Sequence, residues 1–182
     1  EARYPGAQAM FVMGAGGDQN PSTRRKVEYA REHGRTLATA VATALADPGR
    51  PVEGSLRAGL AHATLGLEPH PDNEELIEQV SSANRYVRWK ANYVLSELAV
   101  GHELPRNYLL PVQMMAFGKE VLLVSLGGET VVDYALRTKA KYARDGGPLV
   151  WVAGYSNDVF GYLPSLRVLR EGGYEGGGHM VY

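Results

Sequence analysis

The sequence has no cysteine among its 182 residues. Disulfide scaffolds, zinc sites with cysteine ligands and catalysis by a thiol are therefore excluded. No apolar run approaches the roughly 18 residues that a membrane-spanning helix needs. The first residues, EARYP, show no basic start that leads into an apolar segment, so we expect no signal peptide there.

Neither sign of charge dominates, because 19 Lys and Arg residues stand against 20 Asp and Glu residues and the net charge is -1. Proteins that bind nucleic acid usually carry a basic excess, so we expect no nucleic-acid partner. The hydrophobic share of 45% and the charged share of 21% are ordinary for a folded protein. A chain of this length buries one core, and we predict that residues 1–182 form a single domain.

The pattern of apolar residues predicts a mixed α/β fold, a mixed sheet flanked by helices. Short apolar runs or alternation predict strands at 9–13, 52–67, 110–117, 121–126 and 148–153. Helical spacing and start signals predict helices at 22–46, 74–82, 85–100, 131–143 and 165–170. The run at 9–13 ends in glycine and has the composition of a buried strand.

Three strand ends carry small residues followed directly by polar ones, at 14–20, 127–130 and 154–158. Loops at the carboxyl ends of strands converge in α/β sheets, and sites gather there. The alternative is that each segment is an ordinary turn. The first segment does not match the dinucleotide-binding pattern, since Gln19 stands where the third glycine is needed. It does not match a P-loop either, because no Gly-Lys-Ser/Thr follows.

The segment from Phe11 to Pro21, FVMGAGGDQNP, resembles the active-site strand and turn of the neutral/alkaline non-lysosomal ceramidases. The segment 127–130, GGET, is similar to their Gly-Glu-Phe-Thr motif. Residues 153–176 resemble the family's Ser-Asn…Tyr…Tyr-Glu signature, and the three segments occur in family order. The resemblance implies that the chain corresponds to the C-terminal portion of a larger ceramidase-like catalytic domain.

Ceramidases of this family are zinc-dependent amidases that cleave the N-acyl bond of ceramide in sphingolipid metabolism. The resemblance implies that Glu129 and Tyr162 are metal ligands and that Tyr174 contacts the substrate. The two histidine ligands of the family belong to an upstream part of the domain, and nothing in this chain matches their motif. Two ligands hold zinc weakly, so we expect the chain to be inactive by itself and to need that upstream part or another copy.

One departure from the family concerns the residue before the proline, where the family has its proposed nucleophilic serine and this chain has Asn20. Asparagine cannot form an acyl-enzyme, so the chemistry would depend on zinc-bound water. We expect Asn20 to orient a carbonyl group or stabilise an oxyanion, and Asp18 to support the turn. Ser22 is predicted to start a helix and is a weak substitute nucleophile.

Asn157 and His179 complete the candidate substrate-binding residues. His179 follows a glycine run close to the signature segment and is a candidate ligand or acid–base group. His62 lies in the strand-like run and suits either a core or a site. For Glu129 the alternative role is a carboxylate at a helix start, and for the candidate tyrosines it is aromatic packing.

The favoured hypothesis is thus a ceramidase-like, zinc-dependent hydrolase that acts on an amide or related bond of a lipid-like small molecule. The alternative is a non-catalytic binding or scaffold domain, which the loss of the serine favours. The resemblance implies an extracytoplasmic location. Without the upstream part of the domain, we expect exposed apolar surface and association with a partner or a second copy.

Overall fold

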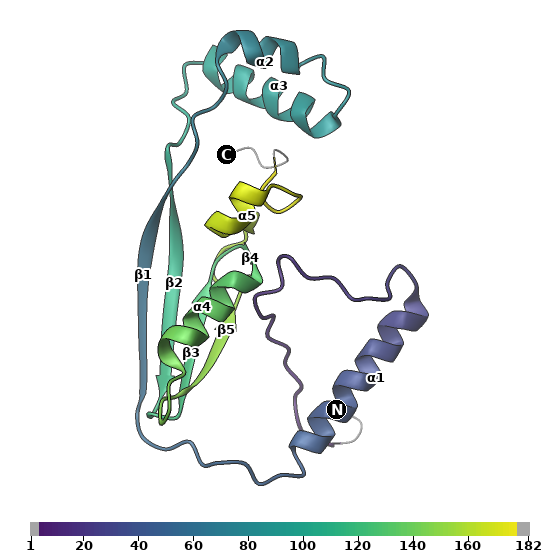
Figure 1. The fold of residues 1–182 in the computed structure, drawn as a ribbon, viewed down its shortest axis with the longest axis vertical. Coiled ribbons are helices and arrows are strands. Elements are labelled where there is room, and N and C mark those ends of the chain that lie inside the picture. The colour runs from purple at the N-terminus through teal and green to yellow at the C-terminus, as the bar shows by residue number, and fades with distance from the viewer. Residues whose placement is uncertain (1–3, 178–182) are drawn as a thin grey trace.

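A computed structural model describes residues 4–177 and confirms the mixed α/β class (Figure 1). The described helices are α1 (Val27–Ala44), α2 (Asn73–Gln79), α3 (Arg85–Ala99), α4 (Val132–Tyr142) and α5 (Leu166–Glu171). The described strands are β1 (Leu56–Gly66), β2 (Asn107–Phe117), β3 (Val121–Leu126), β4 (Glu129–Thr130), β5 (Leu149–Ala153) and β6 (Tyr162–Leu163).

The larger sheet has the strand order β1-β2-β3-β5, and β4 pairs with β6 in a second sheet. β1, β2 and β3 form an antiparallel meander, whereas β5 runs parallel to β3. The predicted hairpin turn between β2 and β3 is present, with Gly118 at a φ of +56°. The parallel crossover from β3 to β5 contains α4, which is the usual way to connect parallel strands.

One face of the larger sheet is packed under α4 and holds the main core. Alternate residues of β3 and β5 point to this face, because side chains along a strand alternate between the two faces. The core residues are Ala15, Leu110, Val124, Leu126, Ala135, Val150, Val152 and Leu163. Val152 is 3% exposed and Leu163 is 3% exposed, so this layer is closed to solvent.

The opposite face of the same sheet carries exposed apolar side chains together with His62, Gln113 and the buried Ser125, and we name it the bare sheet face. The register places on it Leu56, Ala58, Leu60, Met115, Phe117, Val121, Leu123, Leu149 and Trp151. Leu149 is 71% exposed and Leu60 is 58% exposed. None of these nine residues is charged. The expected exposed apolar surface is therefore present on the described part of the chain.

The α2–α3 pair lies at the far end of the long β1–β2 ribbon (Figure 1) and has a small core of its own. Leu76, Ala91 and Val94 are fully buried between the two helices. Both helices begin with a side-chain cap: Asp72 accepts from the Glu75 N–H at 2.9 Å and Asn84 from the Tyr86 N–H at 2.9 Å. The caps satisfy donors that a helix start leaves free.

Two sequence predictions in the first 46 residues are wrong. Residues 9–13 form no strand, and Met10 and Phe11 are 84% and 70% exposed. Only Gly14, at the end of the run, forms a bridge, to Ala153. The apolar run predicts burial, but no layer of the described chain covers it.

The predicted helix at 22–46 begins later, because Arg25 has a φ of +73° and Lys26 is extended. A left-handed residue cannot continue a right-handed helix, so α1 starts at Val27. Ser22 therefore does not start the helix. α1 has no buried residue and stands apart from the sheet (Figure 1).

Candidate functional site

The three glycine-rich segments meet at one end of the β3–β5 layer. The Gly17 N–H donates to the Thr130 carbonyl at 2.9 Å, and the Tyr155 N–H donates to the Gly128 carbonyl at 2.9 Å. The Gly128 N–H donates in turn to the Asp158 carbonyl at 2.7 Å. The convergence expected for these strand ends is thus built by backbone hydrogen bonds.

Close backbone approach explains two of the glycines in these segments. A Cβ at Gly17 would lie 2.3 Å from the Glu129 carbonyl oxygen, which is far inside contact distance. A Cβ at Gly154 would lie 3.1 Å from the Gly14 carbonyl oxygen and 3.2 Å from the Thr130 side chain. Any side chain at Gly17 would push the first segment off β4 and disturb the backbone of Glu129.

Glu129 and Tyr162 are partners in the parallel β4–β6 pair. Residues paired in register point to the same face, so the carboxylate and the phenol lie on one side. Tyr174 follows α5 and packs edge-on against Tyr162, with ring centroids 5.6 Å apart. Tyr174 is 61% exposed, whereas Glu129 and Tyr162 are half-buried. The structure therefore brings together the three residues that the resemblance singles out.

Burial and the neighbouring charge of Glu129 raise the pKa of Tyr162 to about 12. The phenol is therefore neutral near pH 7 in the arrangement described. The carboxylate and the phenol are both oxygen ligands that zinc accepts, and zinc sites have four ligands. Two oxygen donors would supply only part of the ligand set of a zinc ion. Among residues 4–177, no group of three His, Cys, Asp or Glu side chains is placed to hold a metal ion.

Tyr155 is a member of the cluster that the sequence did not single out. Its hydroxyl donates to Oε2 of Glu129 at 3.1 Å, and burial, followed by that carboxylate, raises the pKa of Tyr155. The backbone of Tyr155 has a φ of +54°, which an aromatic residue rarely adopts. The only signal in the sequence is its position directly after a strand end and a glycine.

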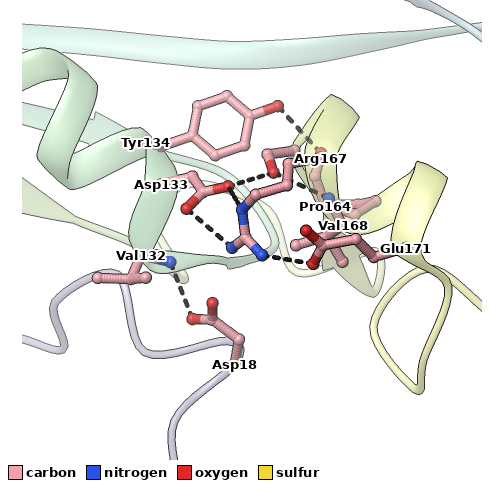
Figure 2. A network of polar contacts seen from close by, with 9 residues as sticks. Asp18, Val132, Asp133, Tyr134, Pro164, Arg167, Val168 and Glu171 are labelled. Atoms are coloured by element: carbon pink, nitrogen blue, oxygen red, sulfur yellow. Dashed lines mark hydrogen bonds and ion pairs between the residues drawn. The ribbon is translucent and has the colours of Figure 1, made fainter.

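Asp18, which was expected to support its own turn, contacts the start of α4. Its Oδ1 accepts from the Val132 N–H at 2.8 Å, at the first turn of α4 (Figure 2). A carboxylate at this position satisfies a free donor and interacts favourably with the helix dipole. The bond ties the first glycine segment to the core layer. Asn20 lies two residues further along the same turn and is exposed.

A polar network fastens α5 to α4 beside the candidate site (Figure 2). Arg167 forms a two-pronged ion pair with Asp133, at 2.9 Å to Oδ2 and 3.0 Å to Oδ1. The Ser165 hydroxyl also donates to Asp133 at 2.5 Å, and Arg167 bonds Glu171 at 2.6 Å. Tyr162 precedes α5 and Tyr174 follows it, so the network fastens the helix that lies between the two tyrosines.

The remaining candidate residues are Asn157, His179 and His62. The Asn157 side chain donates to Oε1 of Gln113 at 3.2 Å, which ties the third segment to β2. Asn157 has a φ of +67°, a conformation that asparagine tolerates. His179 lies outside the described residues. His62 is exposed in β1, where it is paired with Pro111.

Comparisons of the chain with protein-family models, with curated proteins and with solved structures found no match. The resemblance to ceramidases therefore depends on the three sequence segments alone. No helix within residues 4–177 has the length and apolarity needed to cross a bilayer.

Proposed function

We propose that this chain supplies part of the active site of a zinc-dependent hydrolase of the ceramidase type. The bond cleaved is an amide or related bond of a lipid-like small molecule. The observation that carries the proposal is the pairing of Glu129 with Tyr162, beside Tyr174, at the point where the three glycine segments meet. These three side chains come from separate segments, and simple turn formation does not require their convergence.

The roles follow from the chemistry of each group. Glu129 and Tyr162 hold the metal ion, together with histidines from outside this chain or from another copy. Zinc in this site would polarise the amide carbonyl and lower the pKa of a bound water toward about 7. Tyr174 is exposed and able to meet a substrate. Asn20 replaces the family's serine, so it serves to orient the carbonyl group rather than to attack it.

An alternative function is a non-catalytic binding or scaffold domain. Asn20 favours this alternative, because it stands where the family has its proposed nucleophile, whereas the matching Glu129, Tyr162 and Tyr174 argue against it. The tie from Asp18 to α4 also serves a scaffold, since it holds the turn without any chemistry. We also propose that the protein is located outside the cytoplasm, on the resemblance to ceramidases. We propose in addition that it associates with a partner layer or a second copy, which the bare sheet face supports.

The test uses the intact natural polypeptide that contains these residues, with zinc content measured by elemental analysis and turnover by release of a labelled acyl group from N-acyl amides. We expect Glu129→Gln to lower turnover by at least about 100-fold, since one ligand is weakened. Glu74→Gln, an exposed change on α2, is the matched control and keeps full activity. Turnover that is unaffected by Glu129→Gln would contradict the hydrolase proposal and favour the scaffold.

The zinc content of the 182-residue chain is compared with that of the intact polypeptide. Zinc in near-equal molar amount only in the longer form supports a ligand set divided between this chain and upstream sequence. Absence of zinc from both forms contradicts the metal site and leaves Glu129 and Tyr162 as structural residues.

A further inference from the structure

Tyr155 combines an unfavourable backbone conformation with a contact to Glu129. Three described residues other than glycine have a positive φ: Arg25, Tyr155 and Asn157. Arg25 lies in an exposed turn and Asn157 belongs to a residue type that tolerates this conformation. Tyr155 is neither exposed nor a tolerant residue type. Such outliers persist only where the surrounding structure fixes them, and they cluster at functional sites.

The surrounding structure does fix this turn. The Tyr155 N–H donates to the Gly128 carbonyl at 2.9 Å, and the next N–H, of Ser156, donates to the Leu126 carbonyl at 3.0 Å. The Ser156 hydroxyl closes the turn on the Gly154 carbonyl at 3.0 Å. At Gly154 a Cβ would lie 3.1 Å from the Gly14 carbonyl oxygen, so the neighbours would have to shift to admit a side chain. The backbone of Tyr155 is therefore held on the same β3–β4 segment that carries Glu129.

The result of this geometry is that the phenol reaches Glu129. Its hydroxyl donates to Oε2 of the carboxylate at 3.1 Å. Glu129 is half-buried, and this hydrogen bond restricts where one of its oxygens lies. Residues that hydrogen-bond a metal ligand orient it and are typically worth 10- to 100-fold in metal affinity.

We infer that Tyr155 is a positioning residue of the candidate site: its hydroxyl holds Oε2 of Glu129 and thereby sets the direction in which the carboxylate faces a metal ion. This inference depends on the proposed function, because it assigns Tyr155 a role toward the same metal. It adds a residue that the family resemblance does not include. The strained turn serves to place the hydroxyl.

The experiment compares Tyr155→Phe with Tyr134→Phe in the intact natural polypeptide. Both changes remove a single hydroxyl donor, and both bonds are 3.1 Å long. Tyr134 is half-buried on α4 and donates to the Pro164 carbonyl rather than to Glu129. Zinc affinity is measured by competition with a coloured chelator, and the thermal midpoint of each variant reports stability.

We expect Tyr155→Phe to weaken zinc binding about 10- to 100-fold, while Tyr134→Phe binds zinc as the unmodified protein does. The two variants should lose similar amounts of stability. A zinc affinity for Tyr155→Phe within twofold of the unmodified protein, which itself binds zinc, overturns the inference and leaves the proposed function intact. An unmodified protein that binds no zinc overturns the proposed function and this inference together. Equal losses of zinc affinity in both variants also overturn it, since a general structural effect then suffices.

Discussion

The two faces of the β1-β2-β3-β5 sheet have similar composition and opposite surroundings. Leu122, Val124, Val150 and Val152 point to the face under α4, and all are buried or half-buried. On the other face, Leu149 and Trp151 are 71% and 46% exposed, although they are as apolar as their neighbours. Strands that are apolar on both faces are typical of sheets with a layer on each side. Over β3 and β5 the sheet thus has one covered side, which we call the complete side, and one unmatched side, whereas β1 is exposed along almost its whole length.

Several contacts of the candidate site belong to the complete side of this comparison, although Asn157 bonds Gln113 on the bare sheet face. The Asp18 bond to α4 and the Asp133–Arg167 pair both act within or beside the α4 layer. By contrast, α1 has no buried residue and no side-chain cap. Site geometry is therefore expected to persist in any form of the protein that keeps the α4 layer, whatever covers the bare sheet face.

The first prediction tests the comparison directly, by truncating one leucine on each side. Leu126→Ala should cost about 2–5 kcal/mol of unfolding free energy, since it leaves a cavity in the core under α4. Leu149→Ala should change stability by less than about 0.5 kcal/mol, because an exposed side chain has little packing to lose. Urea unfolding of the two variants measures both quantities.

A large cost for Leu149→Ala would show that the bare sheet face is covered in solution. Sedimentation at several protein concentrations then identifies what covers the face. With a second copy, the average mass and the cost of Leu149→Ala both grow with protein concentration, whereas with cover within one chain neither does.

The second prediction sharpens the comparison at glycines. Gly17→Ala should destabilise the protein by about 1–3 kcal/mol, because the new Cβ would meet the Glu129 carbonyl oxygen and one element must move. Gly34→Ala is the control: Gly34 lies inside α1, nothing lies within 4 Å of its Cβ position, and alanine favours helix by about 1 kcal/mol. Urea unfolding reports the first change and far-ultraviolet circular dichroism reports the helix gain.

If Gly17→Ala were as well tolerated as Gly34→Ala, the first glycine segment would not be packed against β4, and the convergence of the three segments would be refuted.

Local patterns were enough to predict β2, β3, β5 and α4, whereas the two-residue strands β4 and β6 were not predicted. Helical spacing predicts α4 within a residue or two, and alternation with a glycine turn predicts β2 and β3. The run at 9–13 failed because apolar composition indicates a need for cover and says nothing about whether a covering layer is present. The start of α1 failed because a positive φ at Arg25 has no marker in the sequence.

Some features of the candidate site could likewise be predicted from local sequence patterns, and others could not. The three converging segments were recognisable, because glycine followed by polar residues at strand ends is a local pattern. The register that sets Glu129 beside Tyr162 joins residues 33 positions apart, and only the parallel β4–β6 pairing creates it. Tyr155 was missed because its role depends on a backbone conformation that tyrosine rarely adopts.

The smallest effect is expected from the Asp133–Arg167 pair, which lies at the solvent-facing rim of the complete side. The hydrogen bond from Arg167, followed by that from Ser165, lowers the pKa of Asp133. A carboxyl whose pKa is lowered by folding stabilises the folded state above its unfolded pKa, which is about 3.9 for aspartate, and that contribution is lost as the pH falls through the folded value.

Thermal midpoints measured between pH 7 and pH 2 should therefore fall less steeply below pH 4 for Arg167→Met than for the unmodified protein. In Arg167→Met the carboxylate keeps only its bond from Ser165, so less of its stabilisation remains to be lost to acid. A steeper fall in Arg167→Met would mean that Arg167 does not favour the charged carboxylate. Because the pair fastens α5, the same variant should leave the β3–β5 core intact while loosening the segment that carries Tyr174, which limited proteolysis would detect as earlier cleavage after α5.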